Sequence, residues 1–375
     1  MSEELSLSLF DSLGQVPDPR RERTRLHQLV DILVIAVCAT ICAAETWEEI
    51  AEFGGAKESW FKKFLALPNG IPSHDTFRRV FLRINPKKFQ AAFLDWVRSA
   101  AQLTEGEIVS IDGKQARGAR ARDGKEGLRM VSAWAGEQRL VLGQVKTEDK
   151  SNEITAIPLL LELLELRGCI VTIDAMGCQR EIAAQIISQE ADYVLSLKGN
   201  QGRLHEEVAE YFAWAEETNF KDLEYDTYTT LEKDHGRIEE RRCWVTEDTG
   251  WFTEKAEWAG LRSFIMVEAS REVLGQTPTR ERRYFISSLA ADAKEALRAV
   301  RGHWQVENSL HWVLDVAFRE DACRTRTGYA PENLATLRHI AVNLLKQERS
   351  CKLGIKSKRL KSGWDESYML KVLNI

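Results

Sequence analysis

The stretch VTIDAMGCQ, residues 171 to 179, is an apolar, β-branched run that stops abruptly at Asp174. β-Branched residues favour strands, so this region predicts a buried strand over residues 169 to 174. A second run, EIVSID at residues 107 to 112, stops in the same way at Asp112. If the two strands are neighbours in one sheet, both carboxylates lie at the carboxyl ends of the strands, where open α/β sheets place their binding sites.

The elements around these two runs predict a mixed α/β sheet. Their order is strand, strand, strand, helix, strand, helix, strand, and the strand–helix–strand steps imply right-handed crossovers into parallel pairings. After the strand at 107–112, this order places strands at 128–136 and 138–147, a helix at 152–168, the strand at 169–174, a helix at 179–191 and a strand at 192–200.

Residues 1 to 103 are predicted to be helical. The apolar run at 29–44 contains Asp31 near its start, and the remainder is shorter than the roughly 18 to 20 residues that span a bilayer, so it predicts a buried core helix and no membrane association. A second helix is predicted to end at Gly54-Gly55. The helix within 70–84 fits either a helix that enters a DNA groove or ordinary helical packing.

The second part of the chain, residues 104 to 375, is predicted to form a second domain around the mixed sheet. It is interrupted at about 221–289 by a segment rich in strand formers and charge, which predicts a strand-rich insertion. Helices are predicted to follow at 293–318 and 331–348.

The composition is that of a soluble globular protein. Of the 375 residues, 44% are hydrophobic and 29% are charged, and the net charge is −5. The seven cysteines contain no CxxC pair, which fits reduced thiols in a cytoplasm. The polar, acidic N-terminus resembles no secretory signal.

Basic residues are gathered in several short clusters. One cluster is typical of a solvated face, whereas several clusters, one of them directly after Asp112, favour a polyanionic partner. The clusters are PDPRRERTR at 17–25, KQARGARARDGK at 114–125, TRERR at 279–283 and KSKRLK at 356–361.

The two aspartates require a cation if they lie close together. Neighbouring carboxylates repel each other, and their hard oxygen ligands suit Mg²⁺ or Mn²⁺. Glu307 is a candidate third acid, with a paired surface acid as the alternative interpretation. His303, Glu307 and His311 also follow one another at four-residue spacing, but three side chains in a straight row on one helix converge poorly on one ion.

The chain resembles the transposases of H-repeat-type (ISAs-type) insertion sequences, a group of Asp-Asp-Glu transposases with an RNase H-like core. The resemblance covers nearly the whole chain. It is carried by LGQVPDPRRERTRLHQLVDIL, PSHDTFRRVF, SIDGKQARGA, VTIDAMGCQ, LSLKGNQ, DHGRIEERR, HWQVENSLHWVLDVAF, NLATLRHIAVNLLK and KRLKSGWDESYMLKVL.

This resemblance assigns the catalytic acids residue by residue. Asp112 matches the first acid, Asp174 the second and Glu307 the third. The wider group carries a Tyr-Arg-Glu-Lys signature around the last acid. Here Val300, His303 and Leu314 stand at the Tyr, Arg and Lys positions.

The resemblance further implies a metal-dependent DNA transposase. Two Mg²⁺ or Mn²⁺ ions held by the three acids would clamp a phosphodiester, cleave double-stranded DNA at the element ends and join the freed 3′ end to target DNA. A homodimer that pairs two ends, working on the nucleoid in the cytoplasm, is expected from the family. The alternative is an inactive or domesticated DNA-binding protein, because the basic companions of Glu307 are absent.

Candidate DNA contacts follow from position and charge. Four lie near the acids, and three share one strand face in DHGRIEERR by the period of two along a strand, where a solvated face is the alternative. The first group is Lys114, Arg117, Lys198 and His303, and the second is His235, Arg237 and Arg241.

Overall fold

The computed structural model describes residues 8–119, 127–147, 153–234, 236–273 and 277–375. The chain separates into two compact units, each built from discontinuous segments. One contains residues 1–102, 113–150 and 307–375, and the other contains residues 103–112 and 151–306. The domain boundary near residue 103 stays a prediction.

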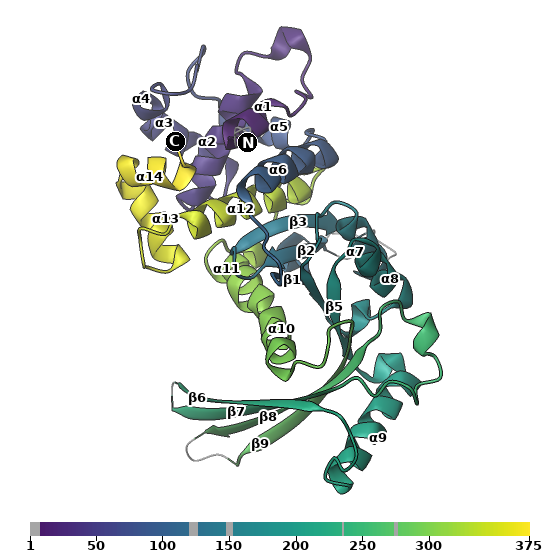
Figure 1. Cartoon of the computed structure of the whole chain (residues 1–375). Helices are drawn as coiled ribbons and strands as arrows, with labels where there is room; N and C mark the ends of the chain where they lie inside the picture. The colour runs from purple at the N-terminus through teal and green to yellow at the C-terminus, as the bar shows by residue number, and fades with distance from the viewer. Residues whose placement is uncertain (1–7, 120–126, 148–152, 235, 274–276) are drawn as a thin grey trace, which may run out of the picture. The chain divides into compact units, whose positions relative to one another are not determined.

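The first unit is mainly helical and joins the two ends of the chain (Figure 1). Its central helix α2 is buried on nearly every side and packs against α12, which confirms the predicted core helix. No described helix combines the length and the apolar character needed to cross a bilayer. The helices are α1 Leu9–Gly14, α2 Leu29–Ile41, α3 Trp47–Ala56, α4 Glu58–Phe61, α5 His74–Phe81, α6 Pro86–Ala100, α11 Trp312–Val316, α12 Ala330–Gln347, α13 Ile355–Trp364 and α14 Glu366–Leu373.

The strands form one mixed sheet of nine, in the order β3-β2-β1-β4-β5-β9-β8-β7-β6. β4 is parallel to both β1 and β5, whereas β9 is antiparallel to β5. These directions confirm the predicted RNase H-like mixed sheet flanked by helices. The core strands are β1 Ile108–Gln115, β2 Arg129–Ala135, β3 Leu140–Lys146, β4 Ile170–Ile173 and β5 Asp192–Leu197.

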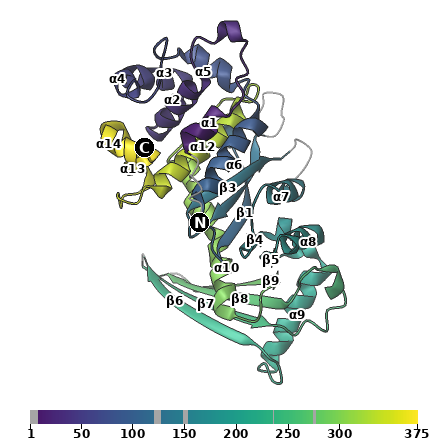
Figure 2. The same cartoon turned by 45° about the horizontal axis from the view of Figure 1, so that its top comes forward.

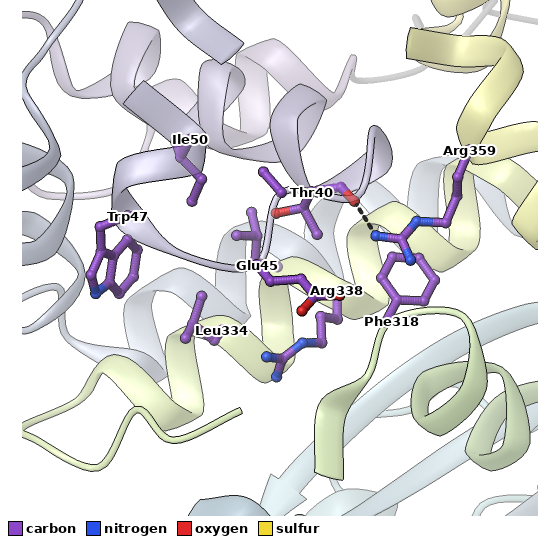
Figure 3. A pocket seen from close by; sticks show the side chains of 10 residues that line it. Thr40, Glu45, Trp47, Ile50, Phe318, Leu334, Arg338 and Arg359 are labelled. Carbon is purple, nitrogen blue, oxygen red and sulfur yellow. Dashed lines mark hydrogen bonds between the residues drawn. The ribbon is translucent and has the colours of Figure 1, made fainter. Parts of the chain in front are cut away.

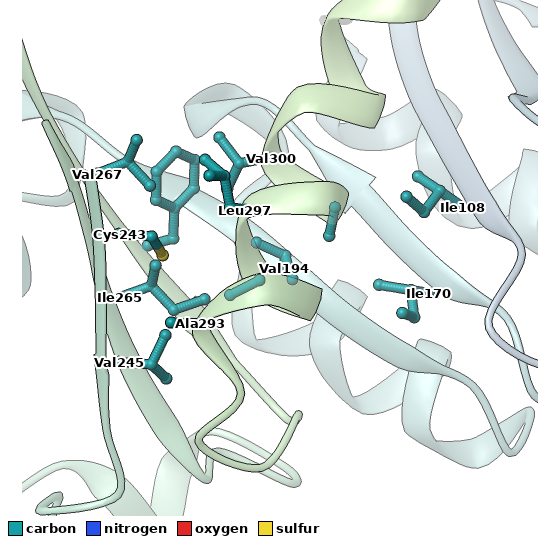
Figure 4. Close-up of a cluster of buried hydrophobic side chains, with 13 residues drawn as sticks. Ile108, Ile170, Val194, Cys243, Val245, Ile265, Val267, Ala293, Leu297 and Val300 are labelled. Carbon is teal, nitrogen blue, oxygen red and sulfur yellow. The ribbon is translucent and has the colours of Figure 1, made fainter. Parts of the chain in front are cut away.

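Helices supply the crossovers between the parallel strands. α7 (Glu153–Leu161) precedes β4, and α8 (Arg180–Ser188) connects β4 to β5. Helix α10 (Ala293–Val306) then packs on the sheet through Leu297 and Val300, against a buried apolar cluster from the core strands and the insertion (Figure 4). Burying each such aliphatic side chain contributes about 1.5–3 kcal/mol, so this contact holds α10 firmly on the sheet.

The predicted insertion is strand-rich, as expected. Four long antiparallel strands extend the sheet, and α9 (Arg203–Glu217) packs near them, where Phe212 stacks on Tyr284 (Figure 2). The strands are β6 Asp226–Asp234, β7 Arg237–Thr246, β8 Ser263–Val273 and β9 Thr279–Ser287.

Several element boundaries differ from those predicted. Helix α3 continues through Gly54 to Ala56, so Gly54 does not end the helix. The glycine instead allows close packing, since a β-carbon there would lie 2.7 Å from Ile71. Strand β1 continues three residues beyond Asp112 to Gln115. Helix α7 ends at Leu161, earlier than predicted. Helices α9, α13 and α14 were not predicted from the sequence.

Candidate active site

Asp112 and Asp174 occupy matching positions on two neighbouring parallel strands. Ile111 of β1 pairs with Ile173 of β4, and each aspartate is the next residue along its strand. Both aspartates are half-buried. The structure therefore brings the first two predicted acids to the same level of the sheet, at the carboxyl end of β4.

The local backbone orients the carboxylate of Asp174. Its Oδ1 accepts hydrogen bonds from the backbone N–H groups of Met176, at 3.0 Å, and Gly177, at 3.4 Å, so Asp174 caps a short 3₁₀ turn. No hydrogen bond or ion pair between described residues reaches Oδ2. One carboxylate oxygen is thus anchored by the chain, and the other is available to a ligand.

A row of hydroxyl groups lies directly beneath the two aspartates. Ser110 pairs with Thr172, and each is two residues before an aspartate, so both hydroxyls lie on the same face of the sheet as the carboxylates. Ser110 Oγ donates to the carbonyl of Gly302 at 3.1 Å, and Thr172 Oγ1 donates to Ser110 Oγ at 3.2 Å. These bonds connect α10 to β1 and β4.

His303 of α10 extends this hydrogen-bonded row. Its Nδ1 lies 3.2 Å from Thr172 Oγ1. Burial lowers the pKa of His303, and the charge of Lys198 acts in the same direction, whereas Asp174 and Thr172 oppose the shift. The pKa of His303 therefore lies below its usual value, which disfavours the charged ring, and the role of His303 as a substitute for arginine stays a prediction.

A small pocket opens beside Asp174. Its volume is about 100 Å³. Within it, Arg283 pairs with Glu281 at 2.8 Å and its guanidinium lies 4.7 Å from the ring centroid of Trp304. The pocket is lined by Thr172, Ile173, Asp174, Val194, Ser196, Lys198, Glu281, Arg283, Phe285, Val300, His303 and Trp304.

Glu307 begins an irregular turn of helix. Residues Glu307–His311 form a π-helix directly after α10, and such turns often mark functional sites. Glu307 is exposed, whereas His311 is buried. The π turn therefore separates the faces of the two side chains, which argues against a metal site built from the row of His303, Glu307 and His311.

The residues present supply the right donors for a hard cation, but the described side chains do not gather into a complete site. Within the described ranges, no three His, Cys, Asp or Glu side chains are close enough together to hold a metal ion. The matched carboxylates of Asp112 and Asp174 are the oxygen ligands that Mg²⁺ or Mn²⁺ takes. Two of the three expected ligands thus lie at one level of neighbouring strands.

The predicted DNA contacts fall into different environments. Lys114 is nearly buried and lies 2.6 Å from Asp315, with Glu320 and Asp321 each at 3.5 Å. Its ammonium is committed to these acids. Arg117 remains 77% exposed, although it lies 3.7 Å from Asp321. Lys198 is exposed at the rim of the pocket.

The predicted basic face of the insertion is largely neutralised. Arg241 pairs with Glu239 at 2.7 Å and with Glu232 at 3.0 Å, and Arg237 lies 3.8 Å from Glu239. His235 lies outside the described residues. Arg237 and Arg241 therefore share a strand face, as predicted, but acids compensate both charges.

The C-terminal basic cluster also has an internal role. Lys358 Nζ donates to the carbonyl of Leu345 at 2.9 Å. Arg359 Nη2 donates to the carbonyl of Thr40 at 2.8 Å, and these two residues line a small cavity (Figure 3). Both side chains are buried, whereas Lys356 is exposed. The cluster is thus not one solvated basic face, because two of its four cations stabilise the fold.

Comparison with known families adds the deciding observation. Residues 93–344 match the family model described as "Transposase DDE domain", and residues 10–97 match its associated segment, "DDE_Tnp_1-associated". The chain belongs to the DDE transposase family. This membership confirms the resemblance on which the three acids were assigned.

Relatives of similar length support the same family. "Putative transposase YncI" of Escherichia coli O157:H7 is 43% identical over 98% of this chain and 94% of its own length. "H repeat-associated putative transposase YhhI" of Escherichia coli K12 is 40% identical over 97% of both chains. The solved piggyBac transposase synaptic complex with hairpin DNA has a TM-score of 0.42 and 11% identity, over 98% of this chain and 78% of that chain.

Some residues of this candidate site were not found from the sequence. Ser110 and Thr172 were read only as strand residues, although each lies two positions before an aspartate, and alternation along a strand could have placed them beneath the acids. Glu281, Arg283 and Trp304 come from distant segments, and no local pattern connects them to Asp174.

Proposed function

We propose that this chain is an active DNA transposase that cleaves double-stranded DNA at the ends of its insertion sequence and joins the freed 3′ ends to target DNA. The observation that carries the proposal is the register of β1 and β4, which sets Asp112 beside Asp174. Two carboxylates at one level of a parallel sheet supply the oxygen ligands that a divalent cation takes, and a metal-dependent phosphoryl transfer provides a reason for the arrangement.

Asp112, Asp174 and Glu307 are the proposed ligands of Mg²⁺ or Mn²⁺. The metal, when bound, would supply positive charge to the scissile phosphate and its reacting oxygens. The backbone N–H groups that fix Oδ1 of Asp174 would hold this carboxylate in one orientation before the metal arrives. Preorganisation of this kind limits the reorganisation that the reaction requires.

DNA is the proposed partner, and exposed cations are the proposed phosphate contacts. Lys198 at the rim of the pocket and the exposed Arg117 fit this role better than Lys114 or Arg241, whose charges are compensated within the protein. Phosphate contacts would make binding steeply salt-dependent. We further propose that two copies pair the two element ends, and that the protein works on DNA in the bacterial cytoplasm.

The test is cleavage of linear DNA that carries the element's own flanking ends, in Mg²⁺ or Mn²⁺ and in EDTA. Wild type is compared with Asp112→Asn, Asp174→Asn and Glu307→Gln. Asp222→Asn is the matched control, because Asp222 is exposed outside the site and asparagine tolerates its positive φ of 61°. Cuts at the ends that need metal, persist in the control and vanish in each site variant support the proposal.

Two results would contradict it. Retained cleavage in Asp112→Asn or Asp174→Asn would exclude the assigned acids. End-specific binding without cuts in either metal would instead support the alternative, a transposase-derived DNA-binding protein without catalysis.

A further inference from the structure

The hydroxyl row beneath the aspartates fixes the position of a hydrogen atom on His303. A carbonyl oxygen only accepts hydrogen bonds, so Ser110 must donate its single hydroxyl hydrogen to Gly302. The oxygen of Ser110 then accepts from Thr172, which uses the single hydrogen of that hydroxyl. The contact between Thr172 Oγ1 and Nδ1 of His303 can therefore form only if Nδ1 carries the hydrogen and donates it.

This assignment determines what the other ring nitrogen does. In a neutral imidazole, one nitrogen donates and the other accepts, so Nε2 of His303 presents a lone pair. Burial lowers the pKa of His303 and so favours the neutral ring, to which this assignment of hydrogens applies. Since Nδ1 is occupied by Thr172, the acceptor is the nitrogen on the opposite side of the ring.

The surroundings of the ring are those of a reaction site rather than of a core histidine. His303 lines the same pocket as Asp174 and Lys198. A core histidine such as His339 provides the contrast, because it is 2% exposed on α12 and lines neither described pocket. His303 thus lines the pocket that contains the second predicted metal ligand.

We propose that Nε2 of His303 accepts a hydrogen bond from the attacking hydroxyl group, which is water during cleavage or the 3′-hydroxyl of the DNA end during joining, and so positions it beside Asp174. This inference rests on the proposed function. His303 is a positioning residue in this scheme, and the hydroxyl group does not transfer its proton to the ring. The position is occupied by arginine in the wider group, and arginine can only donate, so the two side chains cannot play the same part.

Two variants that exchange the hydrogen-bond acceptor for a donor, or keep it, separate this role from a phosphate contact. His303→Arg supplies a permanent donor, and His303→Gln keeps an amide oxygen that can still accept. If His303 positions a hydroxyl group, His303→Arg binds end DNA as tightly as wild type but reacts about tenfold or more slowly, since small misplacements of a nucleophile are costly. His303→Gln then recovers part of the rate. Reaction of His303→Arg within threefold of wild type would overturn the proposal.

Two reaction arms distinguish the source of the hydroxyl group. Uncut end DNA measures attack by water, and precleaved DNA with a free 3′-hydroxyl measures joining. Slowing in the first arm alone assigns water, slowing in the second alone assigns the 3′-hydroxyl, and slowing in both assigns both. Unchanged rates in both arms overturn the inference.

A measurement on the unreacted full chain keeps the inference testable if the wild type makes no cuts. Nitrogen-15 NMR of labelled histidine at pH 7.5, with His303→Gln used to assign the signal, reports which ring nitrogen carries the hydrogen. We expect the Nδ1–H form in wild type and a mixture in Ser110→Ala, because the hydroxyl of Thr172 no longer donates to Ser110 and can then either accept from Nδ1 of His303 or donate to it. An Nε2–H form or a charged ring in wild type overturns the inference, whereas absent cleavage with an Nδ1–H ring contradicts the proposed function alone.

Discussion

Gly302 of α10 packs directly against Ile108 of β1. A β-carbon on Gly302 would lie 2.9 Å from both Cγ2 and Cδ1 of Ile108, closer than atoms of a folded protein tolerate. The absence of a side chain lets the helix approach the strand until the carbonyl of Gly302 meets the hydroxyl of Ser110 at 3.1 Å. The next residue along the helix is His303, so this contact sets the depth at which the ring enters the site.

The first prediction concerns this contact. Gly302→Ala should lower the free energy of unfolding by about 1–2 kcal/mol, because overpacking costs about 1–3 kcal/mol and the gain in helix propensity returns about 0.5–1 kcal/mol. Urea denaturation measures the change. Gly199→Ala is the control, since nothing lies within 4 Å of a β-carbon there.

A double-mutant cycle checks the cause. In Gly302→Ala/Ile108→Ala, the clash is removed with the isoleucine, so the combined loss of stability should be smaller than the sum of the two single losses. Strictly additive losses would show that the two residues do not press on each other.

The second prediction concerns Lys114, whose position after Asp112 suggested a DNA contact. Burial lowers the pKa of Lys114, but Glu320, Asp315 and Asp321 together raise it above its usual value. Lys114→Met removes this cation from Asp315, whereas Glu320 keeps Arg338 at 3.2 Å and Asp321 keeps Arg117 at 3.7 Å. The variant should lose about 1.5–3 kcal/mol of stability, measured by urea denaturation. Lys146→Met is the control, because the pair with Glu332 is 40% exposed on the lysine side and should cost about 1 kcal/mol or less.

The two roles of Lys114 make different demands on DNA binding. If the lysine is structural, the folded fraction of Lys114→Met retains its affinity for end DNA and the salt dependence of that affinity. If Lys114→Met is instead stable, binds end DNA more weakly and shows a weaker dependence of affinity on salt, the result would support the predicted DNA contact of Lys114.

Local sequence patterns predicted the part of the site that short segments determine. The runs before Asp112 and Asp174 are β-branched and apolar, so the strands and their terminal acids were visible, and the crossover helices made a parallel pairing the natural arrangement. The pairing of Ile111 with Ile173 followed from these local features and confirmed the expected neighbours.

Features that depend on distant packing were not visible in the sequence. The π turn at Glu307 interrupts what reads as one helix from 293 to 318, because periodicity alone does not separate one kind of helical turn from another. In KSKRLK, the sequence shows four equivalent cations. The carbonyl groups that accept from Lys358 belong to α12 and to the residue after it, and those that accept from Arg359 belong to α2. Charge clusters therefore overstated the surface available to DNA.

The third prediction tests this division within α13. The carbonyl groups of Thr40 and Ile41 lie at the end of α2, where the ladder of helical hydrogen bonds stops, and Arg359 donates to them at 2.8 and 3.2 Å. The guanidinium of Arg359 also lies 4.0 Å from the ring centroid of Phe318. Burial lowers the pKa of Arg359 to about 10, so it stays charged at neutral pH. Arg359→Met should cost about 2–4 kcal/mol in urea denaturation, since both carbonyls lose a charged donor.

Lys356 provides the matched control for Arg359. It is exposed on the same helix, and Lys356→Met removes the same charge without a buried partner. This variant should unfold within about 0.5 kcal/mol of wild type. Equal losses in the two variants would mean that Arg359 acts through the charge of the helix rather than through the end of α2.

The fourth prediction concerns the pH dependence of stability. Burial raises the pKa of Glu348, but hydrogen bonds from Ser350, Tyr368 and Cys351 outweigh it and bring the pKa to about 2, below the usual value of 4.5. The folded state therefore holds the ionised carboxylate more tightly than the unfolded state does. The resulting stabilisation of about 3 kcal/mol is complete above pH 4.5 and is lost as the pH falls from 4.5 toward 2.

Other acids and buried histidines also titrate over this range, so the effect of Glu348 must be measured as a difference between variants. Glu348→Gln should be less stable than wild type at pH 6, and the gap should narrow as the pH falls to 3, because the wild type alone loses the stabilisation that its ionised carboxylate provides. Tyr368→Phe removes the hydroxyl that donates at 2.7 Å and should show a smaller change between the two pH values. Chemical denaturation at pH 6 and pH 3 measures all three proteins. Parallel profiles for wild type and Glu348→Gln would show that the carboxylate titrates alike in the folded and unfolded states, contrary to its hydrogen bonding in the structure.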